Sequence, residues 1–206
     1  DEIIFITGYK HEQIEQTVEQ YRSKVPISLL YNPFYDVSNN LVSLWLGHLL
    51  MPDNDFMISN GDNIYKPDIF NRVYSGEKEL IQITINRKAS YDADDMKVTL
   101  SKTGNVLRVH KEIEQEKTHA ESVGLALVRG RQSRMLFVNA MLRLITKKEY
   151  LNRFWLEIFN ALADEQNAVK TAEIHHSEWK EIDFHPDIKT LNSVIHYRFG
   201  PGRQPV

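Results

Sequence analysis

Two aspartates follow short strand-like runs of the sequence. Asp62 comes shortly after the apolar run 55–59, and Asp183 comes directly after the run 179–182. Open α/β sheets bind ligands at the carboxyl ends of their strands, where such carboxylates would stand. Mg²⁺ typically takes one or two protein carboxylates and completes its octahedron with water and substrate phosphates. The pair is therefore a candidate Mg²⁺ site, with the alternative that both aspartates only form turns and helix caps.

The elements that must position these carboxylates alternate between strands and helices. Alternating polarity over 79–86, together with a predicted hairpin around 102–105, indicates an antiparallel and half-exposed part of the sheet. We therefore expect an α/β, Rossmann-like fold whose mixed, mostly parallel sheet is flanked by helices. Strands are predicted at 3–6, 27–31, 55–59, 79–86, 97–101, 106–113, 122–128, 169–174 and 179–182, and helices at 10–24, 39–51, 67–76, 131–146, 149–165 and 186–195.

Composition limits the classes of function. A chain of 206 residues that is 42% hydrophobic and 26% charged can bury a core and is most simply one domain. Its net charge of -3 argues against a nucleic-acid-binding surface. The absence of cysteine excludes disulfides and thiolate metal sites, and it is compatible with the cytoplasmic localisation that we expect. No apolar stretch is long enough to predict a membrane span.

Six short motifs occur in the order expected of nucleotidyltransferases that activate phosphorylated small molecules. They are Phe5-Ile6-Thr7-Gly8-Tyr9-Lys10, Asn39-Asn40 with Ser43-Leu44, Gly61-Asp62-Asn63, His110-Lys111-Glu112-Ile113, Glu121-Ser122-Val123-Gly124 and Glu181-Ile182-Asp183. The chain most resembles the phosphocholine cytidylyltransferase branch, near the sugar-1-phosphate nucleotidyltransferases. The resemblance implies a GT-A-type nucleotidyltransferase domain over 1–197, with a helical acceptor-side part at 131–165 and a tail or linker at 198–206.

One part of the family pattern has no match. Members hold the triphosphate with a glycine-rich, Arg-bearing loop and a Pro-Lys pair, and nothing in this sequence resembles them. Because the sequence starts without Met and runs directly into a strand, we expect the N-terminal βα segment of the domain to be missing from it.

The resemblance also implies roles for single residues. Asp62 and Asp183 would be Mg²⁺ ligands and catalytic residues, and Lys111 would hold the acceptor phosphate or the α-phosphate. The nucleotide-binding residues would be Gly8, Tyr9, Asn39, Asn40, Ser43 and Gly61. Simpler alternatives stay open: Lys111 as an exposed lysine on a sheet, Asn39 and Asn40 as helix caps, and Gly8 as a turn residue.

The acceptor side rests on four residues that the resemblance selects. Glu121 would contact the acceptor, and Tyr150, Trp155 and Glu157 would form a pocket for its cation, because aromatic faces and a carboxylate suit a quaternary ammonium group. Trp155 can equally belong to an ordinary core stripe. Phosphoethanolamine, an aminoalkyl phosphonate and a sugar 1-phosphate therefore remain open as acceptors.

The predicted function is a Mg²⁺-dependent cytidylyltransferase that joins CTP to a small phosphocholine-like acceptor and releases pyrophosphate. A homodimer is one expectation for its assembly. The alternatives are a sugar-1-phosphate nucleotidyltransferase, a non-catalytic nucleotide-binding regulatory module and a GT-A glycosyltransferase. A GT-A glycosyltransferase would usually carry Asp-x-Asp, whereas this chain has Asp62-Asn63-Ile64.

Overall fold

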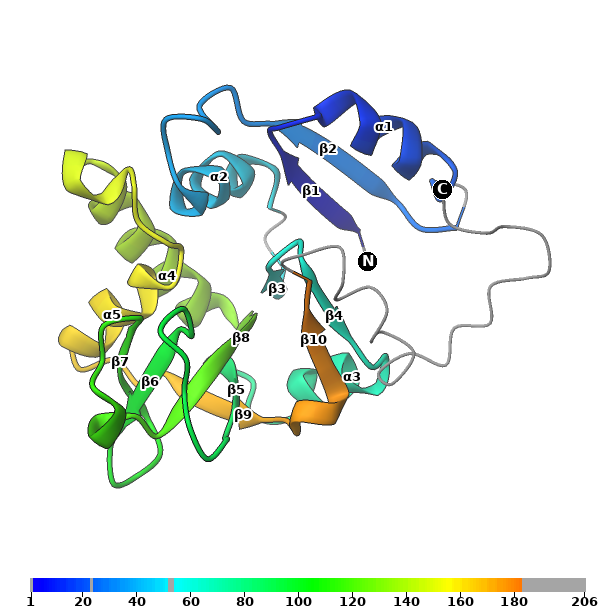
Figure 1. The fold of residues 1–206 in the computed structure, drawn as a ribbon. Coiled ribbons are helices and arrows are strands. Elements are labelled where there is room, and N and C mark those ends of the chain that lie inside the picture. The colour runs from blue at the N-terminus through cyan, green and yellow to red at the C-terminus, as the bar shows by residue number, and fades with distance from the viewer. Residues whose placement is uncertain (1, 23, 52–53, 183–206) are drawn as a thin grey trace. The chain divides into compact units, whose positions relative to one another are not determined.

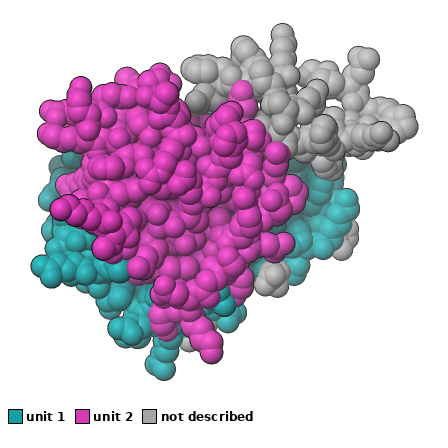
Figure 2. All heavy atoms as spheres, turned by 90° about the horizontal axis from the view of Figure 1, so that it is seen from below, with its two compact units in different colours: residues 1–56, 128–168 teal, residues 57–127, 169–206 magenta. Residues whose placement is uncertain are grey.

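The computed structural model describes residues 2–22, 24–51 and 54–182. The chain divides into two compact units, shown in different colours in Figure 2. Unit 1 comprises residues 1–56 and 128–168, and unit 2 comprises residues 57–127 and 169–206. Asp183, the helix predicted from Pro186 and the tail predicted from 198 lie outside the described residues.

Unit 1 begins with a parallel strand pair and its crossover helix. Strands β1 (Ile3–Thr7) and β2 (Ile27–Tyr31) pair in parallel, with Ile3 opposite Ile27 and Thr7 opposite Tyr31. Because parallel neighbours need a crossover connection, helix α1 (His11–Glu19) lies between them in the chain (Figure 1). This βα unit confirms the arrangement predicted for the first 31 residues.

The other elements of unit 1 are helical. They are α2 (Asn40–Gly47), the 3-10 turn η1 (His48–Leu50), α4 (Arg131–Ile145), the 3-10 turn η3 (Lys148–Tyr150) and α5 (Glu157–Asp164). The second of the two helices predicted after 130 therefore begins at Glu157 and not at 149. In α4 and α5, buried apolar residues recur three and four positions apart, and the rings of Phe137 and Phe159 join the two helices at a centroid distance of 5.6 Å.

Unit 2 is built on a mixed sheet. Its path runs β7-β6-β8-β5-β9, and β3 also pairs with β8. Strand β6 is antiparallel to β7 and β8, whereas β5 is parallel to β9, which confirms the mixed sheet and the hairpin. The strands are β3 (Phe56–Ser59), β5 (Leu80–Asn86), β6 (Lys97–Leu100), β7 (Val106–His110), β8 (Ala120–Arg129) and β9 (Lys170–Glu173).

Strand β5 corrects one prediction. Its alternating sequence indicated an antiparallel, half-exposed strand, but all seven residues are buried and β5 pairs in parallel with β9. Two of its polar residues are accommodated by backbone carbonyls: Gln82 Nε2 donates to Val73 O at 3.2 Å, and Asn86 Nδ2 donates to Ile174 O at 2.9 Å. Alternation here distinguishes an apolar face from a polar face that is also buried.

A second, short sheet was only half predicted. Strand β10 (Trp179–Glu181) was expected, but β4 (Asn63–Tyr65), its antiparallel partner, was not predicted. Helix α3 (Asp68–Tyr74) follows β4, and the described part of the unit also contains the 3-10 turns η2 (Gln115–Lys117) and η4 (His176–Glu178). Within the described ranges, no helix has the length and apolar character needed to cross a bilayer.

Candidate functional site

Asp62 lies in the turn between β3 and β4, and strand β8 holds that turn in place. The backbone N–H of Asn60 donates to Gly124 O at 2.9 Å. Asn63 Nδ2 and the Tyr65 hydroxyl both donate to Val123 O, at 3.0 and 2.8 Å. The turn is therefore fixed to the adjacent carbonyl groups of Val123 and Gly124 in the buried strand β8. The Asp62 side chain itself is exposed.

Gly124 allows this close approach. Its φ of +66° lies in the left-handed region, which side chains other than glycine rarely adopt. A Cβ at this position would lie 2.8 Å from Asn60 Nδ2 and would also overlap the side-chain amide of Asn63. The glycine of the Glu121-Ser122-Val123-Gly124 motif thus has a packing role beside the Asp62 turn.

Tyr65 keeps its proton at neutral pH. Burial raises the pKa of its phenol to about 12, with a smaller contribution from the negative charge of Asp62. The neutral hydroxyl can therefore donate to Val123 O throughout the physiological range. This hydrogen bond stabilises β4, the strand that directly follows the turn.

The second predicted carboxylate, Asp183, lies outside the described residues, but the segment before it runs beside Asp62. In the β4–β10 pair, Asn63 stands opposite Glu181, and the backbone N–H of Ile182 donates to Asp62 O at 2.9 Å. No group of three or more histidines, aspartates or glutamates in the described ranges could hold a metal ion. A hydrated Mg²⁺ needs fewer protein ligands, and the exposed carboxylate of Asp62 fits that requirement.

Lys111 directly follows β7 and is half-buried. Its carbonyl accepts a hydrogen bond of 2.7 Å from Nζ of Lys97, a lysine that is only 6% exposed at the start of β6. Lys97 stands opposite His110 on β7 and Glu121 on β8. Directly opposite residues of antiparallel strands present their side chains on the same face.

Glu121, the predicted acceptor residue, is 5% exposed and lies in a charged cluster. Lys88 Nζ lies 2.8 Å from Glu121 Oε2 and 2.7 Å from Asp95 Oδ2. Burial raises the pKa of the Glu121 carboxyl to about 7, although Lys88 acts in the opposite direction. Burial also lowers the pKa of Lys88, but its hydrogen bonds to Asp95 and Glu121 outweigh this and raise it overall.

The predicted nucleotide residues of α2 have structural partners in unit 1. Asn39 caps the helix, since its Oδ1 accepts from Asn40 N at 2.7 Å. Asn40 Oδ1 accepts from the backbone N–H of Trp155 at 2.8 Å, and Ser43 shares a 3.0 Å hydrogen bond with the buried Asn32. The capping alternative is confirmed for Asn39, and the nucleotide role of all three stays a prediction.

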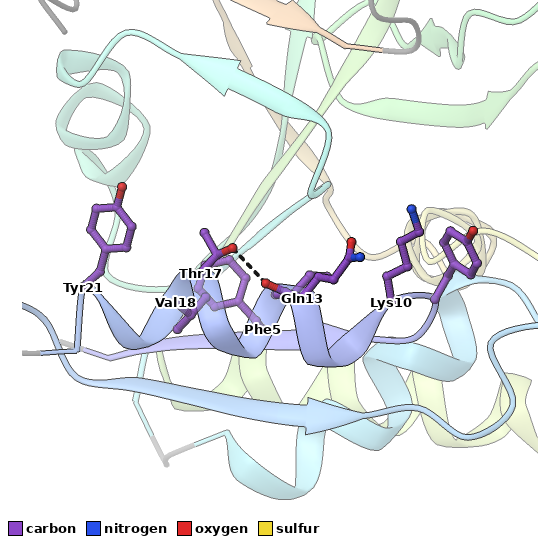
Figure 3. A pocket seen from close by; sticks show the side chains of 8 residues that line it. Phe5, Lys10, Gln13, Thr17, Val18 and Tyr21 are labelled. Carbon is purple, nitrogen blue, oxygen red and sulfur yellow. Dashed lines mark hydrogen bonds between the residues drawn. The ribbon is translucent and has the colours of Figure 1, made fainter. Parts of the chain in front are cut away.

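The other nucleotide residues predicted in unit 1, Gly8 and Tyr9, follow β1. Tyr35 lies directly over Gly8, and a Cβ there would stand 2.6 Å from Tyr35 Cγ. Tyr9 is 69% exposed and borders an open hollow of about 640 Å³ (Figure 3). The hollow is lined by Phe5, Tyr9, Lys10, Gln13, Ile14, Thr17, Val18 and Tyr21. Its single charged side chain is that of Lys10.

The predicted cation pocket falls in the helical part of unit 1. Trp155 is 3% exposed and packs edge-on against Phe159 at a centroid distance of 5.7 Å. Glu157 is half-buried, and its Oε2 accepts from Asn160 Nδ2 at 2.9 Å, while Tyr150 is half-buried beside Lys147. This placement fits the core alternative for Trp155.

Sequence reasoning missed Lys97, Lys88 and Asp95. Lysines and aspartates are usually solvated, so the sequence offers no direct sign that Lys97 is buried or that Lys88 and Asp95 pair beside Glu121. The register of the predicted hairpin is the one feature of the sequence that points to Lys97. It places Lys97 opposite His110, next to the predicted site residue Lys111.

No protein-family model matches the chain, and no curated protein is similar to it in sequence. Solved structures do match. The inositol-1-phosphate CTP transferase from T. maritima superposes with a TM-score of 0.74 at 15% identity, over 94% of this chain and 75% of that one.

Two further structures match over similar lengths. The CTP:phosphocholine cytidylyltransferase from Streptococcus pneumoniae has a TM-score of 0.68 at 18% identity, over 94% of this chain and 78% of that one. A Bacillus anthracis protein described as a glucose-1-phosphate thymidylyltransferase has a TM-score of 0.69 at 15% identity, over 96% and 78%. The chain therefore has the GT-A-like α/β nucleotidyltransferase fold that these CTP transferases and thymidylyltransferases share.

Proposed function

We propose that this protein is a Mg²⁺-dependent cytidylyltransferase that joins CTP to a small phosphorylated acceptor and releases pyrophosphate. The fold supports a nucleotidyltransferase acting on phosphorylated small molecules, because structures described as CTP transferases share it. CTP as the nucleotide and a phosphocholine-like acceptor are our proposals.

The hydrogen bond between Ile182 N and Asp62 O carries this proposal. It supports the hypothesis that the two strand-like runs ending in Asp62 and Asp183 serve one metal. Asp62 and Asp183 are 121 residues apart in the sequence, and the β4–β10 pair brings the segment before Asp183 beside Asp62. Asp62 and Asp183 would hold Mg²⁺, which, when bound, neutralises charge on substrate phosphates.

The reaction needs little proton chemistry from the protein. An oxygen of the acceptor phosphomonoester is already ionised and attacks the α-phosphorus of CTP. A new P–O bond forms, the bond between the α-phosphorus and its bridging oxygen breaks, and pyrophosphate leaves with the electron pair. Lys111 would neutralise the acceptor phosphate or the α-phosphate, and Gly8, Tyr9, Asn39, Asn40, Ser43 and Gly61 would hold the nucleotide. Positioning and charge neutralisation then supply the rate acceleration.

A sugar-1-phosphate nucleotidyltransferase is the second candidate. The burial of Trp155 weakens the case for a cation pocket built on its ring. A structure described as a glucose-1-phosphate thymidylyltransferase also matches this chain as well as the phosphocholine enzyme does. Tyr150, Glu157 and Glu121 remain the acceptor residues that we propose in either case.

The reaction is tested by incubating the protein encoded by the full-length gene with its candidate substrates and measuring the pyrophosphate that is released. CTP, UTP and dTTP are each paired with phosphocholine, phosphoethanolamine, inositol 1-phosphate and glucose 1-phosphate in the presence of Mg²⁺. Release that depends on CTP and a phosphorylated amine supports the proposal. Release only with a sugar phosphate favours the second candidate, and nucleotide binding without any release favours a regulatory module.

Replacing Asp62 with Asn tests the metal role. We expect Asp62→Asn to lower Mg²⁺-dependent turnover by about 100-fold or more, because it removes an anionic ligand where charge is neutralised. The exposed side chain should leave the unfolding midpoint unchanged. Asp94→Asn, which changes an exposed aspartate of the same unit, is the matched control. Equal activity of the two variants would remove Asp62 from the metal site.

A further inference from the structure

Lys97 is a buried lysine without a carboxylate partner in the described part of the chain. Its side chain is among the most enclosed of the charged groups, at 6% exposed. Its ammonium makes one hydrogen bond there, to the carbonyl oxygen of Lys111 at 2.7 Å. By contrast, Lys88 in the same unit forms ion pairs with three carboxylates, those of Asp92, Asp95 and Glu121.

Such an arrangement is unfavourable unless a counter-charge is supplied. Removing an ammonium from water costs several kcal/mol, as an order of magnitude, when no anion compensates it. A carbonyl dipole satisfies one of its three N–H donors and leaves two for another acceptor. Within the described residues, Lys97 is therefore a cation that is positioned but not neutralised.

The neighbours of Lys97 that the structure describes do not neutralise it. Glu121 stands opposite on β8, but its Oε2 lies 2.8 Å from Lys88 Nζ. His110 stands opposite on β7, and its Nδ1 accepts a 3.1 Å hydrogen bond from the backbone N–H of Glu112. In that tautomer the proton lies on Nε2, so His110 offers a further donor. Since His110 and Lys111 are half-buried, solvent reaches this end of β6.

We propose that Lys97 binds a phosphate group of the substrate, with His110 and Lys111 beside it. The ligand class is a phosphomonoester or polyphosphate dianion, which supplies both the counter-charge and the acceptor oxygens that this ammonium lacks. We assign the phosphate to the acceptor molecule, and this assignment rests on the proposed function. Binding of the anion as such does not depend on any catalysis.

The test compares anion binding by Lys97→Met with binding by two reference proteins. Methionine keeps the length and bulk of the side chain and removes its charge. Lys102→Met, at the exposed tip of the same β6–β7 hairpin, is the matched control, and the unchanged protein is the second reference. The probes are inorganic phosphate, phosphocholine and CTP, each titrated by calorimetry.

We expect Lys97→Met to weaken binding of inorganic phosphate and phosphocholine by about 10- to 100-fold, the usual effect of losing a charge-assisted hydrogen bond. Lys102→Met should bind both as the unchanged protein does. If Lys97→Met loses CTP binding but retains phosphocholine binding, the phosphate that Lys97 binds belongs to the nucleotide, and its assignment to the acceptor is wrong. Unchanged binding of all three probes to Lys97→Met would overturn the proposal.

A purely structural role for Lys97 predicts a different result. Loss of the hydrogen bond to Lys111 O would then lower the Tm of Lys97→Met, but added phosphate would still raise the Tm as much as in the unchanged protein. Our proposal predicts that this phosphate-induced Tm shift disappears in Lys97→Met and returns in part in Lys97→Arg. If the unchanged protein releases no pyrophosphate yet shows these binding effects, the proposed function fails and the phosphate site stands.

Discussion

At the scale of single residues, Gly124 is a position where we expect a substitution to destabilise the folded protein directly. We expect Gly124→Ala to lower the free energy of unfolding by about 2–4 kcal/mol, because a left-handed φ and an overlap with two amides act together. Gly104→Ala is the control: Gly104 also has a positive φ, +80°, but nothing lies within 4 Å of its Cβ position. Urea denaturation measures both, and equal losses would show that the packing against Asn60 and Asn63 contributes nothing.

Glu121 gives the stability of the protein a pH dependence with a definite sign. Its folded-state pKa of about 7 is above its ordinary value of 4.5, so the native state binds a proton that the unfolded chain releases. Its contribution to stability is therefore present below about pH 4.5 and is lost as the pH rises to about 7, with a slope of at most about 1.4 kcal/mol per pH unit.

We expect Glu121→Gln to flatten this dependence between about pH 5 and about pH 8, measured as the urea midpoint. Glu77→Gln, at an exposed position of the same unit, should keep the slope of the unchanged protein. A slope in Glu121→Gln that matches the unchanged protein would mean that another group titrates in this range.

At the scale of elements, strand β5 contains a polar group whose removal should be favourable. Thr84 is fully buried, and its hydroxyl has no hydrogen-bond partner among the described atoms. We expect Thr84→Val to raise the free energy of unfolding by about 1 kcal/mol, because valine has the same shape without the unsatisfied group.

Thr7→Val at the end of β1 is the matched comparison. The Thr7 hydroxyl is also buried, but it shares a 2.6 Å hydrogen bond with His11 Nδ1 and donates to Leu30 O at 3.3 Å. This variant should lose about 1–2 kcal/mol. If both threonine substitutions change the urea midpoint in the same direction, the hydrogen bonding of the hydroxyl does not decide the effect.

The elements also show what local sequence can predict. Strand β2 was predicted with its observed limits, and the β6–β7 hairpin and the Asn39 cap were predicted as well, because apolar runs, turn residues and caps act over a few positions. Strand β4 was missed because three residues form a strand only when β10, more than 110 residues later, pairs with them. The buried state of Lys97 depends in the same way on the distant strand β8.

At the scale of the whole molecule, the chain passes between the two units three times, after residues 56, 127 and 168. Strands β3 and β8 each contribute residues to both units. Unfolding of either unit would therefore interrupt strands of the other, and we expect one cooperative transition.

Tryptophan fluorescence can test this expectation. The chain has three tryptophans. Trp179→Phe leaves Trp45 and Trp155 as probes of unit 1, and the double change Trp45→Phe with Trp155→Phe leaves Trp179 as the probe of unit 2. Coincident fluorescence and circular-dichroism transitions in urea are expected for each variant. Separate midpoints for the two probes would make the units independent domains and would contradict the prediction of a single domain over 1–197.

The contact of Gly124 with Asn60 and Asn63 constrains how this region can evolve. A side chain at position 124 fits only if the side chains of Asn60 and Asn63 have already moved or been replaced by shorter ones. Because Asn63 also donates to Val123 O, replacing it first removes a hydrogen bond. Each single step is therefore unfavourable, although the combined change could be tolerated. Homologues should conserve these three positions together or replace them together, and their covariation would record that epistasis.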